Sequence, residues 1–348
     1  MHAIVQRLGQ YTVQLSRPPR ITGAFTLMGP REGAGPLGRY FDAIVEDDMW
    51  GEASAEKAER KYLEQAARRA LDKAGLTERD VDYFIAGDLL NQIVSATFSA
   101  RSLGIPYLGV FAACATSSLG LGLGAMLVDG GYARRVLVAT ASHYQSVERQ
   151  YRYPIELNIQ RRQTNQWTAT GGAAAVLAPP EEGTGPRITR ITFGRVMDWG
   201  VTDANDMGSA MAPAACDTLL RHFQDTATTP GDYDLILTGD LASVGSKLFR
   251  ALAERAGVTL GSKHMDGGAS MFGSAPWAGA GASGSVCSMA VLLGYVVKEM
   301  AQGRYRRVLA LPTGCLHSLP KVFLHSPTTW QQGDSCPGIS HAIVLETD

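Results

Sequence analysis

Cys114 stands where an apolar, strand-like segment at 110–112 meets the start of a glycine- and leucine-rich helical run. Backbone N–H groups at a helix N-terminus carry partial positive charge, so they favour a thiolate or a bound anion. A cysteine in that position can attack an acyl group or line a pocket for an anion. The alternative is that Cys114 is a small, buried, apolar residue, as most single cysteines are.

The elements that position Cys114 occur twice in the chain. A helix at 54–74 precedes an apolar strand that ends in Gly-Asp at 87–88, and Arg-Arg leads into a further strand at 134–140. The second part repeats both signals, with Gly-Asp at 239–240 and Arg-Arg at 306–307. We therefore predict an internal duplication, with one half at residues 1–185 and the other at 186–348. Alternating strands and helices predict a parallel-rich sheet, and two such units side by side form an α/β/α/β/α layered fold.

Composition excludes several classes of protein. The 348 residues carry a formal net charge of -1, so bulk charge predicts no nucleic-acid partner. The sequence contains no run of about 18 apolar residues, so it predicts no membrane-spanning helix. The N-terminus lacks the apolar core of a signal peptide, which predicts an intracellular protein. The five cysteines are scattered without a C-x-x-C pair, which argues against a metal site and against a disulfide framework.

A glycine-rich stretch at 279–284 has the G-x-G-x-x-G spacing of a dinucleotide-binding loop. No clear strand precedes it, as that kind of site requires. We interpret these glycines as positions where a buried helix approaches its neighbours closely, and we predict no bound cofactor.

Seven stretches of the chain resemble known proteins. They are GDLLNQ at 87–92, ACATS at 113–117, SH at 142–143, ERQYRYP at 148–154, DMGSAMAPAA at 206–215, YDLILTGDL at 233–241 and GSKH at 261–264. With the duplicated halves, they resemble the thiolase-like superfamily of thiolases and ketoacyl-carrier-protein synthases, and within it a stage V sporulation family. The resemblance implies a thiolase-like fold, a homodimer, and binding of dipicolinic acid (pyridine-2,6-dicarboxylate) for its uptake into the developing spore. It also implies peripheral association with the forespore or spore inner membrane, beside other membrane proteins of the stage V sporulation A operon.

Condensing enzymes of this superfamily need more than a nucleophilic cysteine. A histidine of the second half and a further histidine or asparagine move protons and stabilise the developing negative charge. In this sequence Asp240 stands at the place of that histidine, and the segment 280–284 has no amide side chain. A carboxylate beside Cys114 raises the pKa of the thiol and repels an enolate. We therefore predict a non-catalytic protein.

Two other functions remain open. The first is a thiolase or ketoacyl synthase that uses Cys114 as its nucleophile. Three histidines are candidates to replace the lost group: His143, His264 and His317. The second is a protein that acts only through the surface between its copies, with a vestigial pocket.

Dipicolinate is a rigid aromatic dianion, so its site needs cations or amide donors for two carboxylates and a flat wall for the ring. The helix N-terminus at Cys114 supplies N–H donors, at the sheet edge where ligands of open α/β folds bind. Arginines interleaved with tyrosines at 148–154 suit bidentate carboxylate contact and ring stacking. The predicted ligand-binding residues are Cys114, Asp88, Asn91, Gln92, His143, Arg149, Tyr151, Arg152, Asp240, Lys263 and His264.

Several of these residues have a structural alternative. Asp88 and Asp240 can cap the helices that follow them, and His143 can be a core histidine with both ring nitrogens satisfied. The arginines at 149 and 152 can form ion pairs at a dimer interface, and Tyr151 can be an interface or core residue.

The remaining cysteines are expected to serve mainly in packing. This expectation applies to Cys216, Cys287 and Cys336. Cys315 ends the repeated strand, near the place where thiolases carry a second cysteine, so it is a further candidate for the site.

Overall fold

The main sheet is built from two five-stranded halves, in a computed structural model that describes residues 6–151, 160–203, 205–316 and 335–348. The first half contains β3 (Arg20–Met28), β5 (Tyr83–Gly87), β6 (Tyr107–Gly109), β7 (Val136–Ser142) and β9 (Gly171–Ala178). The second half contains β10 (Arg187–Phe193), β11 (Leu235–Thr238), β12 (His264–Asp266), β14 (Arg307–Leu311) and β16 (Gly338–Glu346). The strand order is β12-β11-β14-β16-β10-β3-β9-β7-β5-β6, so both halves have the same order when read from their outer edges inward.

The direction of the strands differs from the predicted parallel-rich sheet. β5 is parallel to β6 and β7, whereas β9 is antiparallel to β7 and β3. The second half repeats this pattern, with β11 parallel to β12 and β14 and with β16 antiparallel to β14 and β10. The sheet is therefore mixed. β9 has the sequence GGAAAVLA, which carries no strand signal because alanine favours helices.

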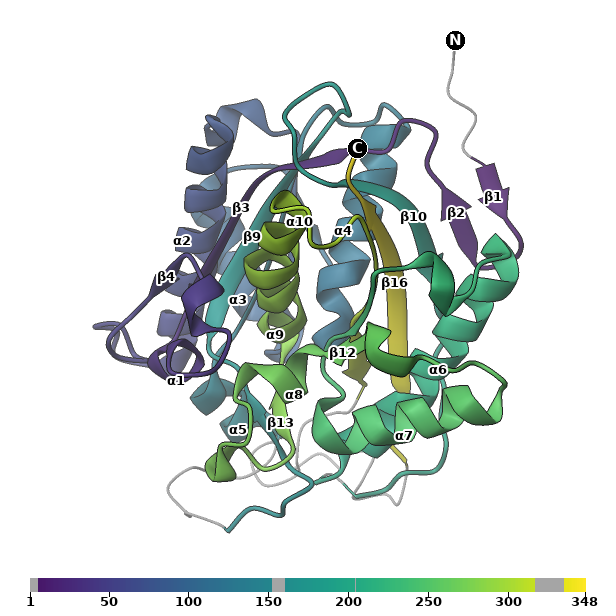
Figure 1. The fold of residues 1–348 in the computed structure, drawn as a ribbon. Helices are drawn as coiled ribbons and strands as arrows, with labels where there is room; N and C mark the ends of the chain where they lie inside the picture. The colour runs from purple at the N-terminus through teal and green to yellow at the C-terminus, as the bar shows by residue number, and fades with distance from the viewer. Residues whose placement is uncertain (1–5, 152–159, 204, 317–334) are drawn as a thin grey trace.

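The helices form three layers around the two half-sheets (Figure 1). They are α2 (Ala55–Ala74), α3 (Val94–Leu103), α4 (Thr116–Asp129), α6 (Met207–Thr226), α7 (Ala242–Arg255), and α9 (Ser285–Ala290), which continues through a π-helical turn (Val291–Val296) into α10 (Val297–Ala301). α2 and α3 cover the outer face of the first half, α6 and α7 cover that of the second, and α4 and α9 lie between the halves. Three hydrophobic clusters fill these interfaces. The α/β/α/β/α layered fold is thus confirmed.

The repeated Arg-Arg pairs are bound in the same way in both halves. The carboxylate of Asp82 accepts hydrogen bonds from the backbone N–H groups of residues 134 and 135, at 2.6 and 3.0 Å. Asp234 accepts the corresponding bonds from residues 306 and 307, at 2.7 and 3.0 Å. One aspartate therefore joins the starts of two neighbouring parallel strands in each half.

Several short elements complete the fold and position the site. β8 and β13 form a separate two-stranded parallel sheet, and β15 pairs with β16. The segment at 29–38 contains the short helix α1 (Pro30–Gly33). No helix among the described residues is both long and apolar enough to cross a membrane. The remaining elements are β1 (Gln6–Leu8), β2 (Thr12–Gln14), α1 (Pro30–Gly33), β4 (Ala43–Ile44), α5 (Tyr144–Tyr151), β8 (Gln166–Thr168), α8 (Gly267–Met271), β13 (Gly281–Ser283) and β15 (Thr313–Cys315).

Candidate functional site

The turn that carries Cys114 is held in a rare conformation by its neighbours. Ala113 has a φ of 48°, which residues with a Cβ seldom adopt. The Thr116 hydroxyl accepts a hydrogen bond from the Ala112 backbone N–H (3.0 Å) and donates one to the Ala113 carbonyl (2.7 Å). Gly314 of β15 packs against the turn, where a Cβ would lie 2.3 Å from the Ala112 carbonyl oxygen and 3.0 Å from the Cys114 nitrogen. Cys114 is therefore fixed just before α4, with a 6% exposed side chain.

Cys114 lines a small cavity that both halves of the chain enclose. The cavity has a volume of about 30 Å³, which is enough for about one water molecule. Its walls are mostly apolar, and no described arginine, lysine or histidine is among the residues that line it. Polar groups reach it from Tyr151, Thr168 and Ser283. The described walls thus include hydroxyl-bearing side chains but no side-chain cation.

The second half supports the Cys114 turn through α9. The Ser288 hydroxyl lies 2.9 Å from that of Ser117 in α4 and 3.5 Å from the carbonyl oxygen of Cys114. The neighbouring Cys287 thiol is fully buried, and burial raises its pKa well above the ordinary value, with further contributions from Asp240 and Cys114. Residues of both halves therefore meet at the start of α4.

Asp240 lies beside this junction. Its carboxyl group is fully buried next to Cys287, Ser288 and the backbone of Thr313. Neither carboxyl oxygen makes a well-formed hydrogen bond within the described chain. Burial, together with the nearby Asp266, raises the pKa of Asp240 well above its usual range. Burial therefore favours the uncharged form of this carboxyl group.

The two Gly-Asp segments use their aspartates differently. Asp88 accepts hydrogen bonds from the backbone N–H groups of residues 90 and 96, both at 2.7 Å, so it caps the start of α3. Burial raises the pKa of Asp88 to about 7. In the second half, Asp266 accepts a hydrogen bond from the Ala242 N–H at 2.8 Å, at the start of α7. The capping alternative is realised at Asp88 and is wrong for Asp240, because Asp266 has taken that position.

Glu59 is a buried acid that the sequence analysis missed. It lies on the apolar face of α2 with no exposed surface, and it accepts a hydrogen bond from the Ser146 hydroxyl at 2.6 Å. Burial and the neighbouring Asp88 raise the pKa of Glu59 well above its usual range. Glu59 lies four residues after Ala55 and three before Tyr62, so helical spacing places it on their buried face. That spacing is the signal that could have identified it.

His143 is not among the residues that line the cavity. Its ring is fully buried, with Nε2 3.1 Å from the Asp48 carbonyl oxygen and Nδ1 accepting a hydrogen bond from the Gln145 N–H at 3.2 Å. Burial lowers the pKa of His143, so the imidazole is neutral. The structure therefore realises the core-histidine alternative, and both ring nitrogens are engaged.

The predicted site residues at 91–92 and 149–152 do not all reach the cavity. Asn91 and Gln92 are exposed outside the cavity. Arg149 forms an ion pair with Glu56 at 3.1 Å, also away from it. Tyr151 does reach the cavity, and its hydroxyl donates a hydrogen bond to the Leu89 carbonyl. Arg152 lies outside the described residues.

Lys263 and His264 do not join the cavity either. The Lys263 ammonium donates hydrogen bonds to the carbonyl oxygens of Gly231 and Tyr233, at 3.0 and 2.6 Å. The His264 ring is 2.8 Å from the Thr238 hydroxyl, and burial lowers the pKa of this histidine to about 4. Both residues support β12 at the outer edge of the sheet. Nowhere in the described chain do three or more His, Cys, Asp or Glu side chains come together as metal ligands.

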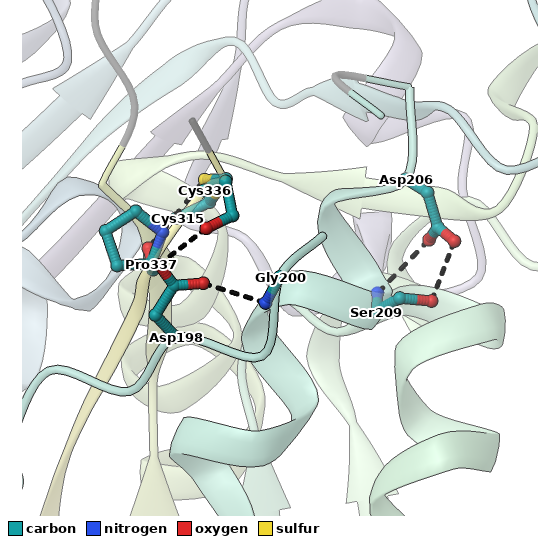
Figure 2. The surroundings of a disulfide bond; sticks show 8 residues. Asp198, Gly200, Asp206, Ser209, Cys315, Cys336 and Pro337 are labelled. Atoms are coloured by element: carbon teal, nitrogen blue, oxygen red, sulfur yellow. Dashed lines mark hydrogen bonds between the residues drawn. A yellow bond between two sulfur atoms is a disulfide. The ribbon is translucent and has the colours of Figure 1, made fainter. Parts of the chain in front are cut away.

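Cys315 and Cys336 form a disulfide, which corrects the expectation that the cysteines are unpaired (Figure 2). Cys315 ends β15, and Cys336 lies two residues before its antiparallel partner β16, so the two side chains meet although 21 residues separate them in the sequence. Cys315 also lines the Cys114 cavity. The bond therefore ties one wall of the cavity to the last strand of the sheet. Cys114, Cys216 and Cys287 are not part of a disulfide.

Comparison with known proteins gives both a family and a fold. The family model described as stage V sporulation protein AD (SpoVAD) matches residues 9–346. The stage V sporulation protein AD of Bacillus subtilis (strain 168) is 42% identical over 338 residues, which are 97% of each chain. Among solved structures, a single-residue variant of Xanthomonas campestris OleA matches with a TM-score of 0.59 and 17% identity, over 95% of this chain and 99% of that one. The 3-oxoacyl-[acyl-carrier-protein] synthase III of Aquifex aeolicus VF5 matches with a TM-score of 0.56 and 14% identity, over 94% and 99%. At these identities the solved structures indicate the fold alone.

Proposed function

Because the chain belongs to the stage V sporulation protein AD family, we propose that this sporulation protein binds dipicolinic acid and takes part in its uptake into the developing spore. The choice of ligand comes from the family resemblance, and the Cys114 cavity, at about 30 Å³, has to widen to hold a ligand of this size. The observation that carries the non-catalytic role is the Cys114 cavity, which keeps the N-terminal end of a helix and has no described histidine or lysine in its walls.

The physical argument against acyl condensation is that no described histidine, lysine or acid lines the Cys114 cavity. A general base must lie within hydrogen-bond reach of the proton that it removes. Asp240 does not line the Cys114 cavity, and its carboxyl group is buried beside Cys287 and Ser288. The rings of His143 and His264 are engaged outside the cavity, and His317 lies outside the described residues.

Isothermal titration of the folded protein with dipicolinate tests the proposal directly. We expect saturable binding, and weaker binding of the monoanion benzoate at equal concentration. Cys114→Ala should retain binding within about threefold, because the turn is expected to act through N–H donors rather than through thiol chemistry. A folded protein that shows no saturable binding of dipicolinate would contradict the proposal.

A condensing enzyme is the second candidate, because Cys114 occupies the start of a helix in a fold that acyl synthases share. Incubation with acetyl-CoA and intact-mass measurement separates the two functions. An acetyl adduct on the wild type that is lost in Cys114→Ala would support the enzyme. We expect no adduct, with a thiol-reactive probe confirming that Cys114 can be reached.

We also propose that the protein is a homodimer. The edge strand β6 has no further strand beside it among the described residues, and Leu108, Phe111 and Phe98 on and around it are 41%, 46% and 39% exposed. An unpaired edge with apolar side chains favours pairing with a second copy. Sedimentation equilibrium should show a dimer for the wild type and a monomer for Leu108→Lys. A wild-type monomer at micromolar concentration would contradict this part.

The last part of the proposal concerns the membrane. We propose that the protein associates peripherally with the forespore or spore inner membrane, beside other membrane proteins of the stage V sporulation A operon. A peripheral protein should be released from isolated spore membranes by high salt or carbonate, without detergent. Release only by detergent would indicate a different mode of attachment.

A further inference from the structure

Five side chains next to α1 form an arginine–tryptophan cluster: Arg31, Tyr144, Arg161, Trp167 and Trp277. The rings of Tyr144 and Trp167 stack with centroids 3.8 Å apart and an interplanar angle of 3°, and Trp277 meets Trp167 edge-on at 5.0 Å. The Arg31 guanidinium lies 4.7 Å from the Trp167 centroid and 4.8 Å from that of Trp277. The Arg161 guanidinium lies 4.9 Å from Trp167. Two cations thus contact one indole ring.

The cluster is separate from the Cys114 cavity. Thr168 lines that cavity, and Trp167 precedes it in β8. Successive side chains of a strand point to opposite faces, so Trp167 lies on the other side of β8. None of the five members of the cluster is among the residues that line the cavity.

Two hydrogen-bond donors of the cluster have no acceptor among the described residues. Trp167 is 9% exposed and its Nε1 is buried without a described partner, as is Nη1 of Arg161. Buried donors in proteins are almost always satisfied, because leaving one unpaired is costly. Both donors therefore suit an acceptor that the described part of the chain does not supply.

The charge of the cluster favours an anion. Arg31 is exposed and makes no hydrogen bond or ion pair with any described residue, so its guanidinium contacts only rings. Arg161 is paired with Glu148 at 2.7 Å. Glu32 and Asp48 interact with Arg31 only at longer range. Burial raises the pKa of Glu32 to about 8, so Glu32 is mainly neutral at pH 7. Asp48 is half-buried. Arg31 thus makes no ion pair within the described chain, and its positive charge lies beside flat aromatic surface.

We propose that the arginine–tryptophan cluster binds a planar aromatic carboxylate. A guanidinium holds a carboxylate with two parallel hydrogen bonds, and the 39% exposed ring of Trp277 offers a face or edge to an aromatic ring. The site goes beyond the proposed function, which needs a single dipicolinate site. The choice of dipicolinate as a probe rests on that function, whereas the site itself rests on the geometry of the cluster.

Tryptophan fluorescence, excited at a wavelength where dipicolinate does not absorb, reports the site directly. The full chain is titrated with dipicolinate, with benzene-1,3-dicarboxylate, which keeps the carboxylate spacing without the ring nitrogen, and with AMP. Arg31→Gln should weaken binding of both dicarboxylates about tenfold or more, and Trp277→Leu should do the same. Arg39→Gln is the matched control, because Arg39 is also exposed and lies 5.0 Å from the ring of Tyr40; it should bind within about twofold of the wild type.

The outcomes separate this site from the proposed function. Wild-type affinity for both dicarboxylates in Arg31→Gln and Trp277→Leu overturns the site, even if calorimetry shows dipicolinate bound elsewhere and the function stands. Arg31-dependent binding of benzene-1,3-dicarboxylate without binding of dipicolinate supports the site and contradicts the function. Arg31-dependent binding of AMP alone overturns the proposed class of ligand. Thermal unfolding of each variant confirms that the comparison is made between folded proteins.

Discussion

Glu32 predicts a pH-dependent loss of stability that a single substitution should remove. The side chain is 1% exposed, its Oε1 accepts a hydrogen bond from the Thr170 N–H at 3.0 Å, and its Oε2 is buried without a partner. Burial raises the pKa of Glu32 from 4.5 to about 8. Glu32→Gln keeps the acceptor for Thr170 and cannot ionise in either the folded or the unfolded state.

The sign of the effect follows from proton binding. Between pH 4.5 and 8 the folded chain holds a proton on Glu32 that the unfolded chain releases, so wild-type stability falls as the pH rises. Each unit of pKa difference corresponds to about 1.4 kcal/mol. For a folded pKa of about 8, the wild type should lose about 3 kcal/mol between pH 5 and pH 8 relative to Glu32→Gln, as an order-of-magnitude figure.

Urea unfolding of both proteins at pH 5, 6, 7 and 8 measures this difference directly. Other titrating groups cancel in the comparison, because both proteins carry them. Glu46→Gln, at an exposed position, is the matched control and should run parallel to the wild type. The reasoning about Glu32 is refuted if the stability difference between Glu32→Gln and the wild type changes by less than about 0.5 kcal/mol over this range.

Three further predictions concern the surroundings of Cys114. Cys336→Ser should lower the free energy of unfolding by about 3 kcal/mol, since it opens a loop of 21 residues; wild type unfolded in a reductant should match the variant. Gly314→Ala should cost at least about 1–3 kcal/mol in denaturant unfolding, because the new Cβ would lie 2.3 Å from the Ala112 carbonyl oxygen; unchanged stability would mean that β15 is not packed against the turn. Tyr151→Phe should cost about 1 kcal/mol through the lost hydrogen bond to Leu89, and an equally stable variant would argue against that bond.

The parts of the fold that local chemistry determines could be predicted from the sequence. The helix at 54–74 begins with a Ser54 cap and ends at Gly75 in the left-handed conformation, as its residue types indicate. The repeated aspartates Asp82 and Asp234 bind the backbone of the next strand within their own half. Such signals act over short distances or recur in both halves, so a single sequence contains them.

The candidate site could be predicted only in part, because it depends on which side chains turn inward at the sheet edge. Tyr151 and Cys114 do so, while His143 turns into the core beside Asp48 and Lys263 supports backbone carbonyls elsewhere. Residue type and order along a strand do not distinguish these outcomes. The disulfide of Cys315 was hidden for a similar reason, since it depends on the pairing of β15 with β16.

Asp240 bears on both parts of the proposed function, the non-catalytic role and the binding of an anion. Asp266 caps α7, so the buried Asp240 carboxyl group makes no well-formed hydrogen bond with the described residues, and burial raises its pKa well above the usual range. An ionised Asp240 would repel a dianion at the start of α4, because charge interactions are poorly screened in a buried site. Burial, which disfavours the charged form of Asp240, weakens that repulsion. A buried carboxyl group in this position therefore favours the proposed anion-binding role over acyl condensation.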